Sequence, residues 1–197
     1  WERFIKLKEI SSSTELVTLT NHKKPAVRCY AFQALSERKD SNTFDVLLLH
    51  LKDSQNVETF QGCVMSSESV GDFFIGNVGY YYNSKTVYQL TQHQKEQIDS
   101  LLLFDPQIKL AAKSYLLRNI KPNPNNYNRI KEIYIKENNP DALIALSKFK
   151  KSEDKKHIIA LLEKSDTRNQ SVGLMAVRFF PDTIFFPYLE KIQQQEI

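Results

Sequence analysis

Apolar residues recur along this chain at three- and four-residue intervals, and alanine has a regular place among them. An alanine stands four residues before a large apolar residue in Ala31–Leu35, Ala112–Leu116, Ala142–Leu146 and Ala176–Phe180. Residues at this spacing share one face of a helix. The last three alanines follow one another at intervals of 30 and 34 residues, the length of one helical hairpin. We therefore predict a series of helical hairpins with these alanines buried where helices meet.

Proline and capping residues indicate where the helices begin. Proline suits the first turn of a helix, because its missing N–H would have no partner there. Such starts are expected at Lys24-Pro25, Asp105-Pro106, Asn123-Pro124 and Asn139-Pro140. Thr91 and Gln94 have the spacing of a capping box, which predicts another helix from about Gln92. The second helices of the hairpins are expected at residues 43–53, 125–138, 152–165 and 182–195.

Residues 54–84 interrupt this pattern. They lack helical periodicity and hold four of the five glycines of the chain. Within them, "DFFI", "GNVG" and "YYYN" are typical of a strand, a glycine turn and a second strand. We predict a β-hairpin over these letters, non-helical backbone over most of residues 62–83, and Phe73 or Phe74 packed on a helix.

Residues 15–53 resemble a known repeat. They contain leucines in the first helix, Pro25-Ala26-Val27-Arg28 at the start of the second, the Ala31/Ala34/Leu35 spacing, and a following helix that ends in Leu-Lys-Asp. This segment looks like HEAT-type repeats, including the short HEAT-like repeats named after phycobilisome lyases. Residues 104–117 repeat the motif with Lys109 in the place of Arg28. The two later copies depart from it, with Asn139 and Gly173 where the basic residue would stand.

The resemblance implies an all-α fold, a right-handed α-α superhelix of HEAT-like helical hairpins with one irregular or β-hairpin insertion. We expect residues 1–197 to form a single HEAT-like repeat domain, with residues 54–84 as its non-helical insertion. HEAT arrays mostly hold partners, so the resemblance favours a solenoid scaffold and names no reaction.

Charge is unevenly distributed, although the net charge of +4 is too small to indicate a nucleic-acid partner by itself. Residues 53–84 contain four acids and no Lys or Arg, whereas residues 106–136 contain seven bases and one acid. We hypothesise that an acidic, aromatic lip and a basic wall line one binding surface. The alternative is that the insertion is a structural plug over helix faces. The candidate binding residues are Glu68, Asp72, Phe73, Phe74, Tyr81, Lys109 and Lys113.

No motif assigns a reaction to the chain. It has no P-loop, dinucleotide fingerprint, HExxH or GxSxG sequence. The four histidines lie in different segments, which predicts no metal ligands. The thiol and serines of residues 62–69 have no assignable base to activate them. We expect no catalytic residue, no metal site and no cofactor, and we favour free thiols at Cys29 and Cys63 over a bridge between them.

These features favour a non-catalytic protein- or peptide-binding scaffold. The alternative is a nucleic-acid-binding or base-processing HEAT-like protein that uses the basic hairpin of residues 106–136, and a third hypothesis is an enzyme related to the lyase-type arrays. No run of about 18 apolar residues occurs, so no membrane span is predicted. Because the chain begins at Trp1, we expect a trimmed chain; the cytoplasm is favoured, and an exported form stays open.

Overall fold

The computed structural model describes residues 2–61, 63–82 and 85–195. This part of the chain contains twelve α-helices, three short 3-10 helices and one two-stranded sheet, so the predicted all-α class is confirmed. The chain divides into two compact units, Trp1–Ala112 and Lys113–Ile197, and we describe each by itself. The expected single domain stays a prediction.

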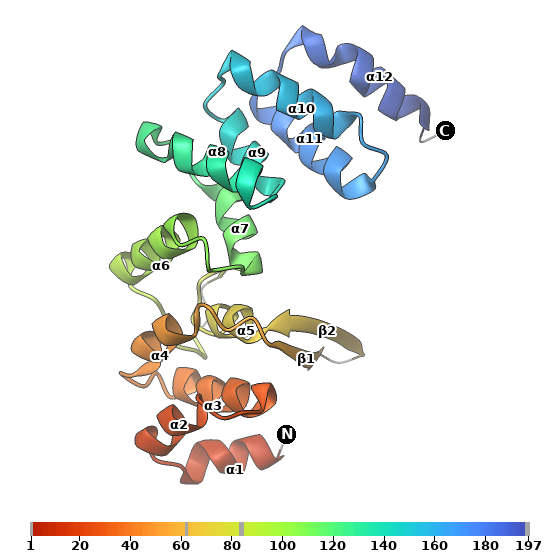
Figure 1. The fold of residues 1–197 in the computed structure, drawn as a ribbon. Helices are drawn as coiled ribbons and strands as arrows, with labels where there is room; N and C mark the ends of the chain where they lie inside the picture. Colours follow the sequence, from red (N-terminus) through yellow and green to blue (C-terminus); the bar gives the residue numbers. More distant parts are fainter. Residues whose placement is uncertain (1, 62, 83–84, 196–197) are drawn as a thin grey trace. The chain divides into compact units, whose positions relative to one another are not determined.

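The N-terminal unit packs short helices beside one antiparallel hairpin (Figure 1). Ser12 and Thr91 each complete a capping box, as the sequence predicts for Thr91, and Pro25 opens its helix in the first turn. The helices are α1 (Glu2–Ile10), α2 (Ser13–Leu19), α3 (Pro25–Glu37), α4 (Thr43–His50), α5 (Val70–Gly76) and α6 (Gln92–Phe104), and the strands are β1 (Asn56–Gln61) and β2 (Val64–Ser69).

Two stacked phenylalanines lie in the core of this unit. Phe74 of α5 packs on Phe32 of α3, with ring centroids 3.8 Å apart and ring planes 9° from parallel. Both side chains are fully buried, and burying a side chain of this kind contributes about 1.5–3 kcal/mol. The prediction that Phe73 or Phe74 packs on a helix is confirmed for Phe74, whereas Phe73 is only partly buried.

The hairpin lies earlier in the chain than predicted. Its strands pair from Asn56↔Ser69 to Gln61↔Val64, whereas "DFFI" belongs to α5 and the described residues after Gly76 form turns and bends. The predicted strands are therefore wrong for "DFFI" and for residues 80–82, and Asn83 lies outside the described residues. The cause is local, because the Ser69 side chain accepts a hydrogen bond from the Asp72 N–H and starts a helix there. The prediction of non-helical backbone over most of residues 62–83 is confirmed for β2 and for residues 77–82, and it is wrong for α5.

Two glycines of this segment occupy positions where a side chain would not fit or would strain the backbone. Gly79 has a φ of +66°, which residues with a Cβ rarely adopt. A Cβ on Gly71 would lie 2.8 Å from a methyl carbon of Leu110 and 3.1 Å from the carbonyl oxygen of His50. Gly71 and Gly79 therefore serve the close packing of α5 and the turn after it. Gly62 lies outside the described residues.

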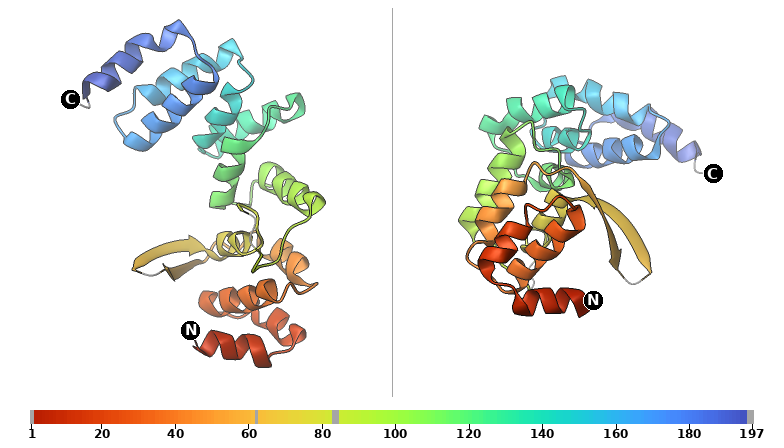
Figure 2. Two further views of the ribbon diagram at one scale, coloured as in Figure 1. Left: turned by 180° about the vertical axis from the view of Figure 1, so that it is seen from behind. Right: turned by 60° about the horizontal axis from the view of Figure 1, so that its bottom comes forward.

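The C-terminal unit is helical in its described residues (Figure 2). Like α4 of the N-terminal unit, the helices α8 (Tyr127–Lys136), α10 (Lys155–Leu162) and α12 (Phe186–Gln195) lie in the ranges predicted for second helices. Short 3-10 turns at Pro124–Asn126, Ser152–Asp154 and Thr183–Phe185 lead into these three helices. The remaining elements are α7 (Ala111–Asn119), which begins in the N-terminal unit, α9 (Asp141–Ser147) and α11 (Thr167–Phe179).

The four alanines singled out by the sequence are all buried. Ala31, Ala112, Ala142 and Ala176 have no exposed surface, and they lie in α3, α7, α9 and α11. Around Ala142 the helix α9 contacts both α8 and α11. The prediction that these alanines are buried is confirmed for all four, and contacts with other helices are shown for α3, α9 and α11.

Helix α7 does not begin at Pro106, as predicted, but at Ala111. The Asp105 carboxylate accepts a hydrogen bond from the Gln107 N–H at 2.8 Å, which closes a turn instead of capping a helix. Ile108 is buried beyond this turn. The start of α7 is set by a residue from another element, which belongs to the site described next.

Candidate binding site at the root of the hairpin

A pocket of about 500 Å³ lies at the root of the hairpin, within the N-terminal unit. Four of the seven candidate residues line it, namely Glu68, Asp72, Tyr81 and Lys109. Residues of the acidic insertion and one of the bases after Pro106 therefore line one pocket, and the hypothesis of a shared acidic and basic binding surface stays a prediction. The other lining residues are small or polar: Ser54, Asn56, Ser67, Ser69, Gly76 and Ala111.

The remaining three candidates lie elsewhere. Phe74 belongs to the core, and Phe73 is partly buried. Lys113 belongs to the C-terminal unit, is 3% exposed, and pairs with Glu137 at 2.8 Å between Nζ and Oε2. Its charge is therefore neutralised within that unit and is not presented on a surface as Lys109 is.

Strand pleating decides which side chains of the hairpin face the pocket. Directly paired residues of an antiparallel ladder lie on the same face, and neighbours along a strand lie on opposite faces. Asn56, Ser67 and Ser69 therefore share one face, and Val57 and Glu68 share the other. Val57 is buried, and β1 contacts α3. The pocket is consequently floored by hydroxyl and amide groups on the face turned away from α3.

The Glu68 carboxylate does not belong to this polar floor. The register pairs Glu68 with Val57 and so directs its side chain toward the α3 face. Burial raises the pKa of Glu68, the Thr59 hydroxyl opposes that rise by hydrogen bonding, and the nearby charge of Asp72 adds to it. Glu68 thus forms part of the pocket wall as a strand residue, with its charge on the opposite side.

Asp72 acts as the N-terminal cap of α7. One carboxylate oxygen accepts hydrogen bonds from the Ala111 N–H at 3.0 Å and the Ser69 hydroxyl at 2.8 Å, and the other accepts one from the Ala112 N–H at 3.0 Å. The carboxylate meets the positive end of the helix dipole there, which stabilises its charge. Both acids of the predicted lip are therefore engaged in the protein's own structure.

Lys109 supplies the positive charge of the pocket. It is exposed, it is the one cationic side chain among the described lining residues, and its ammonium forms no ion pair within the described part of the chain. Tyr81 borders the same space and makes an edge-on contact with the buried Tyr80 ring, at 5.2 Å between centroids. A cation among hydroxyls and a phenol suits an anionic group such as a carboxylate.

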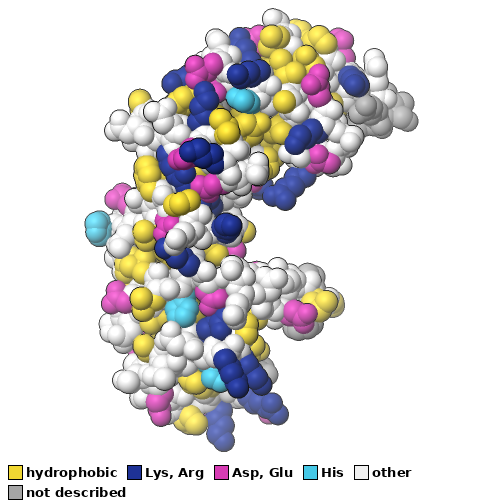
Figure 3. Space-filling model, in the orientation of Figure 1, with side chains coloured by type: hydrophobic (Ala, Val, Ile, Leu, Met, Phe, Trp, Pro, Cys, Tyr) yellow, Lys and Arg dark blue, Asp and Glu magenta, His cyan; other side chains and the backbone are white. Residues whose placement is uncertain are grey.

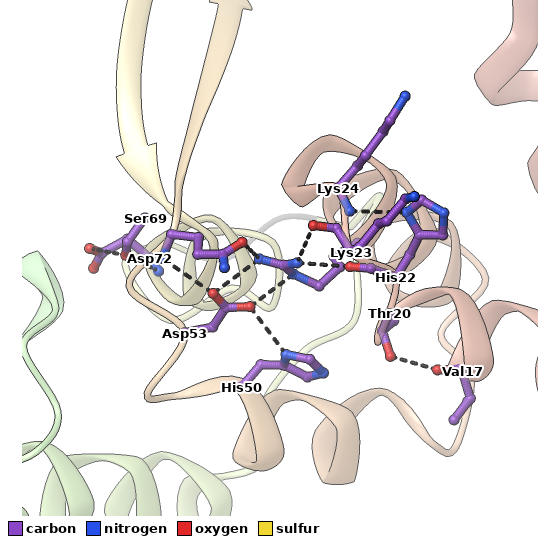
Figure 4. Close-up of polar contacts among 11 residues, drawn as sticks. Val17, Thr20, His22, Lys23, Lys24, His50, Asp53, Ser69 and Asp72 are labelled. Carbon is purple, nitrogen blue, oxygen red and sulfur yellow. Dashed lines mark hydrogen bonds and ion pairs between the residues drawn. The ribbon is translucent and has the colours of Figure 1, made fainter.

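A buried arginine fixes the root of the hairpin to α3. The Arg28 guanidinium donates to the His22 carbonyl at 2.8 Å and to the Gln55 side chain at 2.8 Å, and it pairs with Asp53 at 2.9 Å. Figure 4 shows Asp53 between this cluster and His50, whose imidazole Nδ1 lies 3.5 Å from the Asp53 carboxylate. Because Gln55 leads directly into β1, the network makes the pocket floor rigid where the hairpin leaves the helices.

The groups with reactive potential do not gather at this pocket. Cys29 and Cys63 are free thiols, as predicted, and burial raises the pKa of the Cys29 thiol to about 12, which makes it a poor nucleophile. Within the described residues, no cluster of three or more His, Cys, Asp or Glu side chains is placed to hold a metal ion. None of the described helices combines the length and apolar character needed to cross a bilayer.

The C-terminal unit has a pocket of its own, of about 530 Å³. Lys164 and Arg168 line it together with Tyr134, and both cations are exposed. Neither forms an ion pair with the residues that the structure describes. Like the first pocket, this pocket therefore offers positive charge that no carboxylate of the described residues neutralises.

Sequence reasoning missed the polar floor of the first pocket and the arginine network under it. The available signal was the alternation of small polar residues in "SQNVE" and "VMSSES", which becomes one hydroxyl-lined face once these segments pair. The prediction instead placed the hairpin turn at the glycines of "GNVG", later in the chain than the observed strands.

Comparison with protein-family models, with curated proteins and with solved structures finds no match for this chain.

Proposed function

We propose that this chain is a non-catalytic scaffold of HEAT-like hairpins that binds a protein or peptide partner, and that the pocket at the root of the hairpin holds part of that partner. The proposal is carried by one observation: a polar pocket with one unpaired cation adjoins the exposed strand β2. Exposed strand edges offer main-chain hydrogen bonds to a partner, and pockets beside them select its side chains.

A recurring cation–carboxylate contact supports the repeat arrangement. Arg28 pairs with Asp53, Lys113 with Glu137, and Arg118 with Asp141, in each case joining a helix to a segment 23 to 25 residues further along the chain. A similar contact joins Lys155 to Asp182. Together with the four buried alanines, these pairs are what a stack of similar hairpins would require.

Ion pairs within the protein weaken the nucleic-acid alternative for residues 106–136. Five of the seven bases in this segment contact carboxylates, including acids that lie outside it such as Asp141 and Glu153. Neutralised bases release fewer counterions from a phosphate backbone and so contribute less to binding. The alternative is better supported at the C-terminal pocket, where Lys164 and Arg168 are free of such partners.

Gly76 provides a direct test of the binding pocket. It lines the pocket, and a Cβ built on it meets no atom within 4 Å, so a side chain there would enter open space. Gly76→Phe should therefore fill the pocket without disturbing the fold, and Gly76→Ala is its matched control. The measurement is capture of partners by the full chain from nuclease-treated extract, followed by measurement of the affinity of each purified partner.

The expected result is a partner that binds the unmodified chain and Gly76→Ala but binds Gly76→Phe at least about tenfold more weakly. Equal binding to all three chains would overturn the assignment of the pocket. Salt-dependent binding of duplex or single-stranded DNA that survives Gly76→Phe and is lost in a Lys164→Glu, Arg168→Glu double variant would favour the nucleic-acid alternative.

A further inference from the structure

The outer edge of β2 carries main-chain groups that no other strand uses. The Val70 N–H donates to the Gln55 carbonyl at 2.9 Å, so residues 55 and 70 form a hydrogen-bonded pair of the antiparallel ladder. Such pairs alternate with pairs whose N–H and C=O groups point away from the partner strand. With this register, Met65, Ser67 and Ser69 are the β2 residues whose main-chain groups point outward.

The surroundings of the hairpin leave the β2 edge as the accessible one. β1 is the strand that contacts α3, and in the views of Figures 1 and 2 β2 lies on the side away from that helix. Among the described strands β2 has β1 as its only partner. An added strand would therefore lie beside β2 and run along the mouth of the pocket that Ser67 and Ser69 line.

Charge along the pocket face changes in a fixed order. At the root lies Lys109, which has no ion pair with the residues that the structure describes. The next pair on this face after Asn56↔Ser69 is Glu58↔Ser67, and Glu58 is exposed. Beyond it Met65 is 64% exposed. Figure 3 shows the hairpin as largely neutral and polar, with acidic and hydrophobic side chains toward its far end.

We propose that β2 binds an extended peptide segment as an added strand, and that the segment places an acidic side chain at Lys109, a basic one opposite Glu58 and an apolar one at Met65. This inference rests on the proposed function and names the chemistry of its partner. Side chains two residues apart in a strand lie on one face about 6–7 Å apart. The three groups therefore occupy alternate positions of the peptide, in the order acidic, basic, apolar from the root outward.

Each position follows from the groups that the peptide would meet. A carboxylate at the root pairs with Lys109 and accepts hydrogen bonds from serine hydroxyls, whereas Asp72 is already occupied and Glu68 faces away. Ser67 is small, so a long Lys or Arg side chain can extend over it to Glu58. An acid at that middle position would be repelled by Glu58, which adds discrimination against other peptides.

A second copy of this chain fits the edge less well than such a segment. Residues 53–84 contain four acids and no Lys or Arg. Two hairpins paired along β2 would place Glu58 and Glu68 of both copies in one sheet with no Lys or Arg of the hairpin to offset them, which disfavours the pairing. The proposed occupant is therefore a separate segment with both charge signs.

Ser67→Pro separates edge pairing from other modes of binding. Its N–H points outward, so proline removes a donor from the free edge and leaves the ladder with β1 intact. Ser66→Pro is the matched control for hairpin damage, because the Ser66 N–H points toward β1. Far-ultraviolet circular dichroism and denaturation curves of both variants check that Ser66→Pro disturbs the fold and Ser67→Pro does not.

The probe is a library of displayed random nonapeptides selected on the full chain, followed by a synthetic peptide of the selected sequence measured by fluorescence anisotropy. We expect selection of an acidic, a basic and an apolar residue at alternate positions. Ser67→Pro and Lys109→Glu should each weaken binding at least about tenfold, and a peptide with Lys in place of its acidic residue should recover affinity for Lys109→Glu. Light scattering should show a monomer.

Three outcomes overturn the inference: no alternating motif, undiminished binding by Ser67→Pro, or a dimer that Ser67→Pro dissolves. If a natural partner is still lost in Gly76→Phe but bound by Ser67→Pro, the pocket function stands and only edge pairing is wrong. If neither variant affects any partner, the proposed function fails as well.

Discussion

At the scale of single residues, the acids of the insertion do not form the acidic lip that their sequence pattern predicts. Asp72 caps a helix, and Glu68 lies on the face of the hairpin turned toward α3. Lys109 and Lys113 likewise separate, since one is exposed at a pocket and the other is buried against Glu137. Residues of the same charge that lie close together in the sequence thus have different roles, because burial and strand pleating place their side chains in different surroundings.

Glu68 should make stability depend on pH in a predictable direction. Its pKa is raised in the folded chain by burial, so the stability that it contributes is complete below its unfolded-state pKa, about 4.3, and is lost as pH rises through the folded-state pKa. Glu68→Gln removes this loss. The free energy of unfolding in urea should therefore exceed that of the unmodified chain at pH 7, and the difference should shrink toward pH 4.

The matched control for that change is Glu58→Gln, since Glu58 is exposed on the other face of the same hairpin. It should leave the pH dependence unchanged. A Glu68→Gln variant that is less stable than the parent at pH 7 would show that the carboxylate is needed for the fold.

At the scale of elements, helix α7 depends on a side chain that comes from α5. The Asp72 carboxylate accepts hydrogen bonds from the N–H groups of both Ala111 and Ala112. The hairpin root is fixed in the same non-local way, through Arg28 of α3 and Asp53. The Asp72 contacts explain why the start of α7 could not be read from the residues around Pro106.

Asp72→Ala should therefore destabilise the chain by about 1–2 kcal/mol, the range for loss of a helix cap. Asp45→Ala serves as the control, because Asp45 lies exposed in the first turn of α4. Urea unfolding monitored by circular dichroism measures both. An Asp72→Ala chain as stable as the Asp45→Ala chain would contradict the capping role.

At the scale of the whole molecule, buried alanines recur through both units. Their spacing predicted helical hairpins, and all four are inaccessible to solvent. The assignment to HEAT-like repeats and the superhelix remain predictions, supported by the recurring cation–carboxylate pairs.

Ala112→Leu tests this packing. Added methylene groups in a filled core force neighbouring side chains apart and should lower the free energy of unfolding by about 1–3 kcal/mol. Ala111→Leu is the control, because Ala111 is exposed in the same helical turn, and its effect should stay within about 0.5 kcal/mol. Comparable denaturation midpoints for the two variants would mean that the alanine face leaves room for a larger residue.

The sequence by itself determined the helical class, the burial of the four alanines, the second helices and the Thr91 capping box, because each follows from residues within a few positions of one another. The same local signals misplaced the hairpin and the start of α7. The hairpin was misplaced because the Ser69 cap, itself a local signal, outweighs the strand pattern of "DFFI". Only the tertiary structure decided the start of α7, because Asp72 reaches a helix that begins 39 residues later in the chain. The pocket likewise exists only after β1 and β2 pair, because pairing brings Asn56 and Ser69 to one face beside Lys109.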